Sequence, residues 1–145
     1  MMRRYRLLQT TTILAIAVAF VACARFGEMS KGNVQNGIEV GLALKPAEPR
    51  SGDNNFKVSL KGPIGSIENA AVTVTYFMPA MGTMAVMKGS AQAKLVGSGE
   101  YVATLNLPME GDWTITVNAN PPDGQPITAR FQIRTGSSSI QFLGQ

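Results

Sequence analysis

The 145-residue chain contains no histidine and a single cysteine, Cys23. One cysteine cannot form an intramolecular disulfide, so an apolar core must stabilise any domain that the chain forms. Without imidazole, the sequence lacks the commonest general base and the commonest metal ligand. None of its serines or threonines lies in a recognisable catalytic triad or nucleophile elbow. We therefore expect a protein that binds a ligand or partner, and not an enzyme.

Charged residues are also scarce, at 15% of the chain. The whole chain has 13 Lys and Arg against 9 Asp and Glu, but Arg3, Arg4 and Arg6 lie at the extreme N-terminus. Without these three, 10 basic residues stand against 9 acidic residues. Domains that bind nucleic acid gather Lys and Arg into patches with interleaved aromatic residues, and no such patch is present. We therefore expect no nucleic-acid partner.

Residues 1–23 have the layout of a bacterial lipoprotein signal peptide, with a basic head, an apolar run and a cysteine. The apolar run ILAIAVAFVA, residues 13–22, is shorter than the ~20 residues that span a bilayer. The sequence FVAC, which ends at Cys23, resembles a lipobox, with Phe20 where leucine is usual. We predict cleavage before Cys23 and acylation of its thiol, which would anchor the protein outside the cytoplasm, at the periplasmic face or the cell surface. The alternative is an ordinary signal peptide with an incidental cysteine.

The rest of the chain lacks sustained helical spacing and shows the period of two that is typical of half-buried strands. Residues 24–36 are polar and predict a flexible tether, residues 37–135 a single β-domain, and residues 136–145 a loose tail that could add an edge strand. Alternation predicts strands near residues 38–44, 56–60, 72–76, 91–96, 101–107, 113–117 and 127–133.

Turn sequences such as KGPIGS and NPPDGQP separate these predicted strands. About seven short strands with polar connections predict an all-β fold, an immunoglobulin-like antiparallel sandwich. Tyr101 and Trp113 lie at inward positions of this pattern, and we predict that both lie at the centre of the core.

The stretch MPAMGTMAVM holds four of the eight methionines, at positions 78, 81, 84 and 87. A spacing of three places Met78 and Met81 on opposite faces of a strand, and Pro79 and Gly82 disfavour a helix. Met78 continues the inward parity of the preceding strand, as Met109 does for another strand. The sequence therefore predicts a strand that runs into an exposed loop, where thioethers gain little burial energy.

Three interpretations of these methionines remain open. Thioether sulfur is a soft, neutral ligand that selects Cu(I), and a tight turn can bring several such sulfurs to one ion. The candidate ligands are Met78, Met81, Met84, Met87 and Met109. An adaptable surface for a protein or lipid partner is the second interpretation, and core packing without a site is the third.

Two stretches, AAVTVTYFMPAMG at 70–82 and GSGEYVATLNLPMEGDWTITV at 97–117, resemble the YtkA-like/FixH-like domain family. The matching positions are Met78, Pro79, Met81, Gly82, Gly99, Tyr101, Met109, Gly111 and Trp113. The resemblance spans roughly residues 38–134. It implies a small immunoglobulin-like sandwich outside the cytoplasmic membrane, linked to copper handling and to the assembly of copper-containing oxidases. Thr83 stands where many relatives have histidine, which removes a ligand suited to Cu(II).

These observations predict a membrane-tethered, extracytoplasmic protein that handles copper and binds Cu(I) through its methionine-rich loop. A copper transporter or an oxidase-assembly protein is the expected partner. The alternative is an accessory module that binds no metal and docks on a membrane complex through the same loop.

Overall fold

The computed structural model describes residues 25–145. The predicted signal peptide and Cys23 lie outside these residues. The described chain forms ten strands and one short 3-10 helix, η1 (Gln35–Gly37), and no helix within it is long and apolar enough to cross a bilayer. The strands are β1 (Ser30–Asn33), β2 (Glu39–Lys45), β3 (Gly52–Gly62), β4 (Gly65–Ser66), β5 (Ala71–Met78), β6 (Met87–Gly97), β7 (Glu100–Leu107), β8 (Asp112–Asn120), β9 (Ile127–Arg134) and β10 (Ile140–Gly144).

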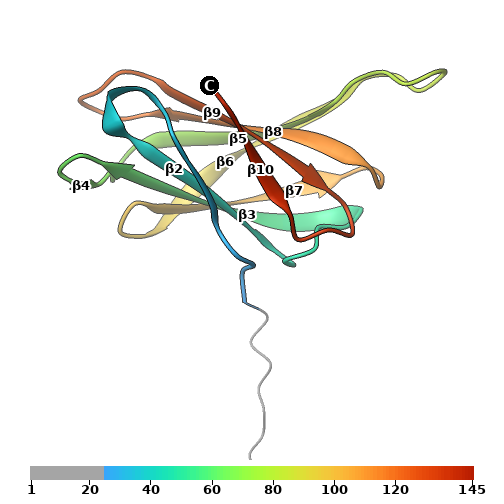
Figure 1. Ribbon diagram of the computed structural model, residues 1–145, viewed down its shortest axis with the longest axis horizontal. Helices are drawn as coiled ribbons and strands as arrows, with labels where there is room; N and C mark the ends of the chain where they lie inside the picture. Colours follow the sequence, from blue (N-terminus) through green and yellow to red (C-terminus); the bar gives the residue numbers. More distant parts are fainter. Residues whose placement is uncertain (1–24) are drawn as a thin grey trace, which may run out of the picture.

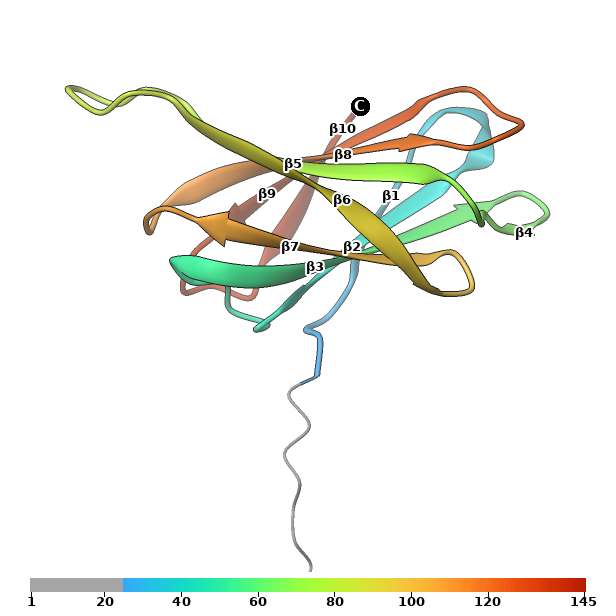
Figure 2. The same cartoon turned by 180° about the vertical axis from the view of Figure 1, so that it is seen from behind.

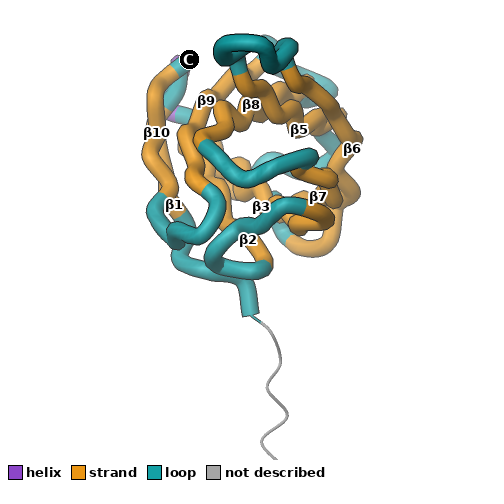
Figure 3. Tube along the Cα trace, turned by 90° about the vertical axis from the view of Figure 1, so that its right-hand side faces the viewer, coloured by secondary structure: helices purple, strands orange, loops and turns teal. Residues whose placement is uncertain are grey.

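The strands pair antiparallel in the order β1-β2-β3-β7-β6-β5-β8-β9-β10, and β4 pairs with β3 alone (Figure 1). Strand β6 belongs to both layers, because its first half pairs with β5 and its last residues pair with β7. Viewed end-on, β2, β3 and β7 form one layer, and β5, β8 and β9 form the other (Figure 3). The edge strands β1 and β10 contact each other and bring the sandwich close to a closed barrel. The prediction of an all-β, immunoglobulin-like sandwich is confirmed, with more strands than predicted.

The core lies between the two layers and contains the inward residues of β2, β3, β5, β7, β8 and β9, while the inward residues of β6 are partly buried and pack against it. Trp113 and Tyr101 are the largest fully buried side chains, as predicted. The Tyr101 hydroxyl donates a hydrogen bond to the Ile67 carbonyl (2.9 Å) and accepts one from the Ala70 N–H (3.1 Å). Tyr101 thereby fixes the entry to β5 in addition to filling the core.

Both ends of the predicted domain are more ordered than the sequence indicated. Residues 30–33, predicted as part of a flexible tether, form β1, and residues 140–144 of the predicted tail form β10, the edge strand considered for that tail. The Phe142 ring packs against Phe131, with centroids 5.3 Å apart, and lies directly over Gly32. Strand β1 carries Ser30 and Gly32 at its inward positions, so alternation of apolar residues could not reveal it.

Candidate functional site

The methionine-rich stretch forms the tip of a β-hairpin between β5 and β6. Met78 pairs with Met87 at the end of the ladder. Farther out, Met81 and Met84 form an isolated antiparallel bridge, and each N–H donates to the other carbonyl, at 3.1 and 2.8 Å. Gly82 has φ +56° at the first central position of the two-residue turn, which is the backbone that a type II′ hairpin turn requires. This methionine hairpin, residues 78–87, projects beyond the body of the barrel (Figure 2).

The two methionine pairs lie at different depths. Met78 and Met87 end the ladder of β5 and β6, whereas Met81 and Met84 form their bridge beyond residues 79–80 and 85–86, which belong to no strand. Met78 is 2% exposed, whereas Met81 is 49% and Met84 is 38% exposed. The expectation that sulfurs 78, 81 and 84 converge on one point is therefore wrong: Met81 and Met84 face each other, and Met78 lies in the core.

The other candidate methionines lie at the base of the hairpin. The Met78 methyl group abuts Gly111, where an added Cβ would be 2.8 Å from it. Met87 and Met109 are half-buried and pack against the core. The prediction that Met78 and Met109 point inward is thus confirmed, because Met78 lies in the core and Met109 packs against it. These three side chains support the hairpin, and the exposed sulfurs are those of Met81 and Met84.

The turn between β7 and β8, which carries Met109, is fastened to β9. The Gly111 N–H donates to the Thr135 hydroxyl at 2.8 Å, and the Gly111 carbonyl accepts from the Thr135 N–H at 3.1 Å. Arg134 makes a bidentate contact with Asp112, at 2.7 and 2.8 Å. The hydrogen bonds that Arg134 donates to Asp112, together with the Arg134 charge, lower the pKa of Asp112. Its carboxylate therefore stays ionised and is already paired with Arg134.

The chemistry available at the hairpin tip is that of neutral sulfur. Residues 78–87 include no charged side chain. Within residues 25–145, no three His, Cys, Asp or Glu side chains come close enough to hold a metal ion together. Val86, two residues after Met84, adds another exposed apolar side chain to the hairpin. The tip can therefore offer two soft donors or a small apolar contact surface.

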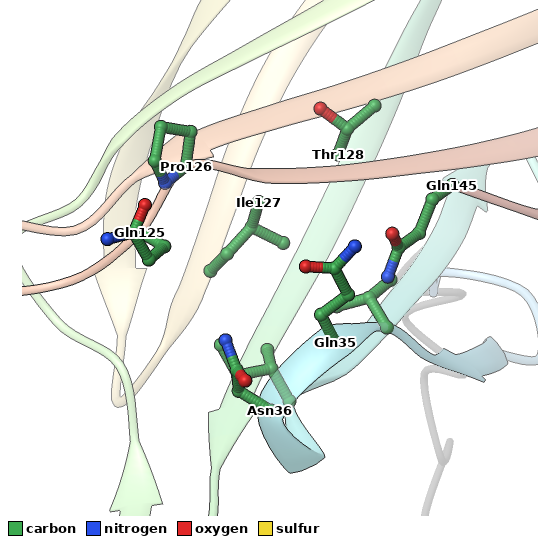
Figure 4. A pocket seen from close by; sticks show the side chains of 9 residues that line it. Gln35, Asn36, Gln125, Pro126, Ile127, Thr128 and Gln145 are labelled. Atoms are coloured by element: carbon green, nitrogen blue, oxygen red, sulfur yellow. The ribbon is translucent and has the colours of Figure 1, made fainter.

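Two cavities lie at the opposite end of the barrel. One, of about 240 Å³, is lined by the amides of Gln35, Asn36 and Gln125, with no acidic or basic side chain (Figure 4). The other, of about 440 Å³, is more apolar and lies between the β3–β4 turn and the loop of Pro121 and Pro122. Neither contains a methionine, so neither belongs to the candidate site.

The register of the hairpin is what sequence reasoning missed. The methionines are placed symmetrically about residues 82 and 83, with Met81 opposite Met84 and Met78 opposite Met87. A glycine followed by threonine at that centre is a two-residue hairpin signal. Read in that way, the spacing of three predicts two cross-strand pairs in place of a single cluster.

Comparison with known proteins places most of this fold in a family. The family model described as YtkA-like matches residues 32–118, which run from β1 into β8 and include the methionine hairpin. Among solved structures, the crystal structure of the PmoD soluble domain from Methylocystis sp. ATCC 49242 (Rockwell) is similar, with 14% sequence identity and a TM-score of 0.47. That match covers 76% of this chain and 98% of the PmoD domain, and at this level it carries no information on function. No curated protein matches the sequence.

Proposed function

Because the chain belongs to the YtkA-like family, we propose that it is an extracytoplasmic copper-handling protein that binds Cu(I) at the tip of the methionine hairpin. The observation that carries the proposal is the bridge between Met81 and Met84. Two partners that exchange both backbone hydrogen bonds have Cα atoms about 5.5 Å apart and side chains on one face. Two flexible thioethers at that separation can reach one ion.

The donor set suits Cu(I) better than a hard or divalent ion. Thioether sulfur is neutral and soft, and soft ligands select Cu(I). Two sulfurs also leave the ion open to a further ligand, and both side chains are exposed to solvent. An open, exposed site suits an ion that is cargo to be passed to a transporter or an oxidase-assembly protein, which we propose as the partner. We propose a binding and delivery role and no catalytic one.

The proposal includes attachment to the membrane. Cys23 lies outside the described residues, and its lipobox-like context supports cleavage and acylation. Several acyl chains, at ~0.8 kcal/mol per buried methylene, would hold the protein durably at the outer side of a bacterial membrane. Labelling with a radioactive fatty acid tests this step, and the Cys23→Ser variant is the control.

Titration of the purified full chain with Cu(I), under reducing conditions and against a chromophoric Cu(I) chelator, tests the copper proposal. We expect one Cu(I) per chain, and loss of that binding when Met81→Leu and Met84→Leu are combined. Leucine keeps the apolar volume and removes the sulfur. The matched control combines Met87→Leu and Met109→Leu, which we expect to retain the binding. Stoichiometric binding that survives the first double substitution would contradict the proposal.

The exposed Val86 of the same hairpin favours one alternative, a module that docks through the tip without metal. Crosslinking in copper-free medium distinguishes the two functions. A docking surface tolerates Met81→Leu with Met84→Leu and is disrupted by serine at both positions, because serine removes the apolar contact. At a metal site, the Cu(I) binding measured by titration is lost with the leucine pair and with the serine pair alike.

A further inference from the structure

Residues 26–29, at the start of the described chain, pack on the outer side of the layer that contains β2 and β3. The Phe26 ring sits 4.9 Å from the Lys57 Nζ, and the Gly27 N–H donates to the Leu44 carbonyl at 2.8 Å. The Met29 side chain covers Gly41 so closely that a Cβ there would meet its sulfur. We call this outward side of β2, β3 and β7 the tether face. The chain leaves the domain from this face (Figures 1 and 3).

We propose that the tether face lies directly on the surface of an anionic membrane; this proposal rests on the acylation of Cys23, which is part of the proposed function. Cys23 precedes Phe26 by three residues, a reach of about 10 Å at most. The two layers alone are about 10 Å apart, and a path to the far side would also have to pass an edge of the barrel. An anchor at Cys23 can therefore bring the tether face to the bilayer, but not the outward face of β5, β8 and β9.

The charges of the tether face suit lipid headgroups that carry negative charge. On this face and on the adjoining strands β1 and β6, the lysines are Lys31, Lys45, Lys57, Lys61 and Lys94, and the acidic residues are Glu39, Asp53 and Glu100. The N-terminal segment adds one charge of each sign, Arg25 and Glu28. Two of the lysines are paired, Lys31 with Glu39 at 3.2 Å and Lys57 with Glu100 at 3.7 Å. Basic side chains near an anionic membrane surface are attracted to its headgroups.

The outward face of β5, β8 and β9 carries mostly threonine and asparagine, with Arg130, Arg134 and Asp112 as its charged residues. Among residues 25–145, Arg134 is paired with Asp112, so this face offers one unpaired basic side chain, whereas Lys45, Lys61 and Lys94 are unpaired on the tether face and its adjoining strands.

This orientation decides where the methionine hairpin points. The hairpin leaves the barrel from the layer opposite the tether face, on the side away from the departing N-terminal segment (Figures 1 and 2). Met81 and Met84 would therefore face the aqueous phase. A partner that receives Cu(I) from them would approach through the solvent, or project from the membrane past the body of the domain.

Two matched threonines allow a direct test. The Thr104 hydroxyl, on the tether face, donates a hydrogen bond to the Asn55 side chain. The Thr128 hydroxyl, on the opposite face, donates an equivalent hydrogen bond to the Asn118 side chain. Acylation consumes the one native cysteine, so Thr104→Cys and Thr128→Cys can each be labelled with an environment-sensitive fluorophore. The acylated full-length variants are inserted into vesicles of phosphatidylcholine and phosphatidylglycerol in equal parts, with a nitroxide on some headgroups. We expect severalfold stronger quenching of the label at 104 than at 128.

Each outcome bears on a distinct statement. Equal quenching at both positions, or stronger quenching at 128, in chains that float with the vesicles overturns the orientation and leaves the anchor standing. If the chains do not float with the vesicles, both the lipid anchor and the proposed orientation are contradicted. Cu(I) titration of the same variants reports the hairpin site separately. Asn106→Cys and Gln132→Cys, on the same two faces, replace any threonine variant whose thermal unfolding shows that it does not fold.

Discussion

At the scale of single residues, the methionines of this protein divide into two kinds that have the same side chain and different surroundings. Met78 fills space between the layers and touches Gly111, so its contribution is packing. Met81 and Met84 lie at the surface and leave 49% and 38% of their area exposed. A methionine in the first position stabilises the fold, whereas one in the second is free to serve a ligand or a partner.

This division predicts different effects of truncation on stability. Met78→Ala should lower the free energy of unfolding by about 2–5 kcal/mol, because it removes buried atoms and leaves a cavity. Met81→Ala should change it by no more than about 0.5 kcal/mol, as is usual for exposed positions. Urea unfolding, followed by the fluorescence of Trp113, measures both. Similar losses for the two variants would show that the hairpin tip is packed against another part of the molecule.

At the scale of elements, the closure of the barrel depends on β1 and β10, the two strands that alternation predicted least well. Their contact brings the Phe142 ring over Gly32, a position with no room for a Cβ. The ring also covers Phe131 of β9. The seam thus joins a strand near the start of the described chain to one at its end, and a glycine makes the close approach possible.

A double-mutant cycle tests this seam. Gly32→Ala should destabilise the protein by about 1–3 kcal/mol, because the new methyl group clashes with the ring. In the Phe142→Ala background the ring is absent, and the same substitution should cost much less, which gives a coupling energy between the two sites. Thermal unfolding of the four proteins provides the measurement. Additive effects would mean that β1 and β10 do not touch in solution.

At the scale of the whole molecule, the length of free chain between the anchor and the domain controls the orientation on a membrane. Packing of residues 26–29 on the tether face leaves only a few residues to span that gap. Insertion of a ten-residue Gly/Ser linker after Ala24 should allow the domain to tumble, because such linkers behave as flexible coils.

The linker variant should show nearly equal quenching at positions 104 and 128, while flotation and Cu(I) binding stay unchanged. The measurement is the vesicle experiment described above, with the uninterrupted chain as its control. An unchanged difference in quenching would indicate that the lysines of the tether face, and not the short anchor, hold the domain in place.

The sequence by itself determined the all-β class, most of the strands and the inward position of Trp113, Tyr101 and Met78, because alternation with a period of two is local. The tertiary structure decided how the ends close, since β1 has no apolar pattern and is held by a ring from β10. It also decided that Met81 faces Met84 while Met78 is buried, because register and burial depend on partner strands. Pairing between distant segments, which no local pattern encodes, is the physical reason for that division.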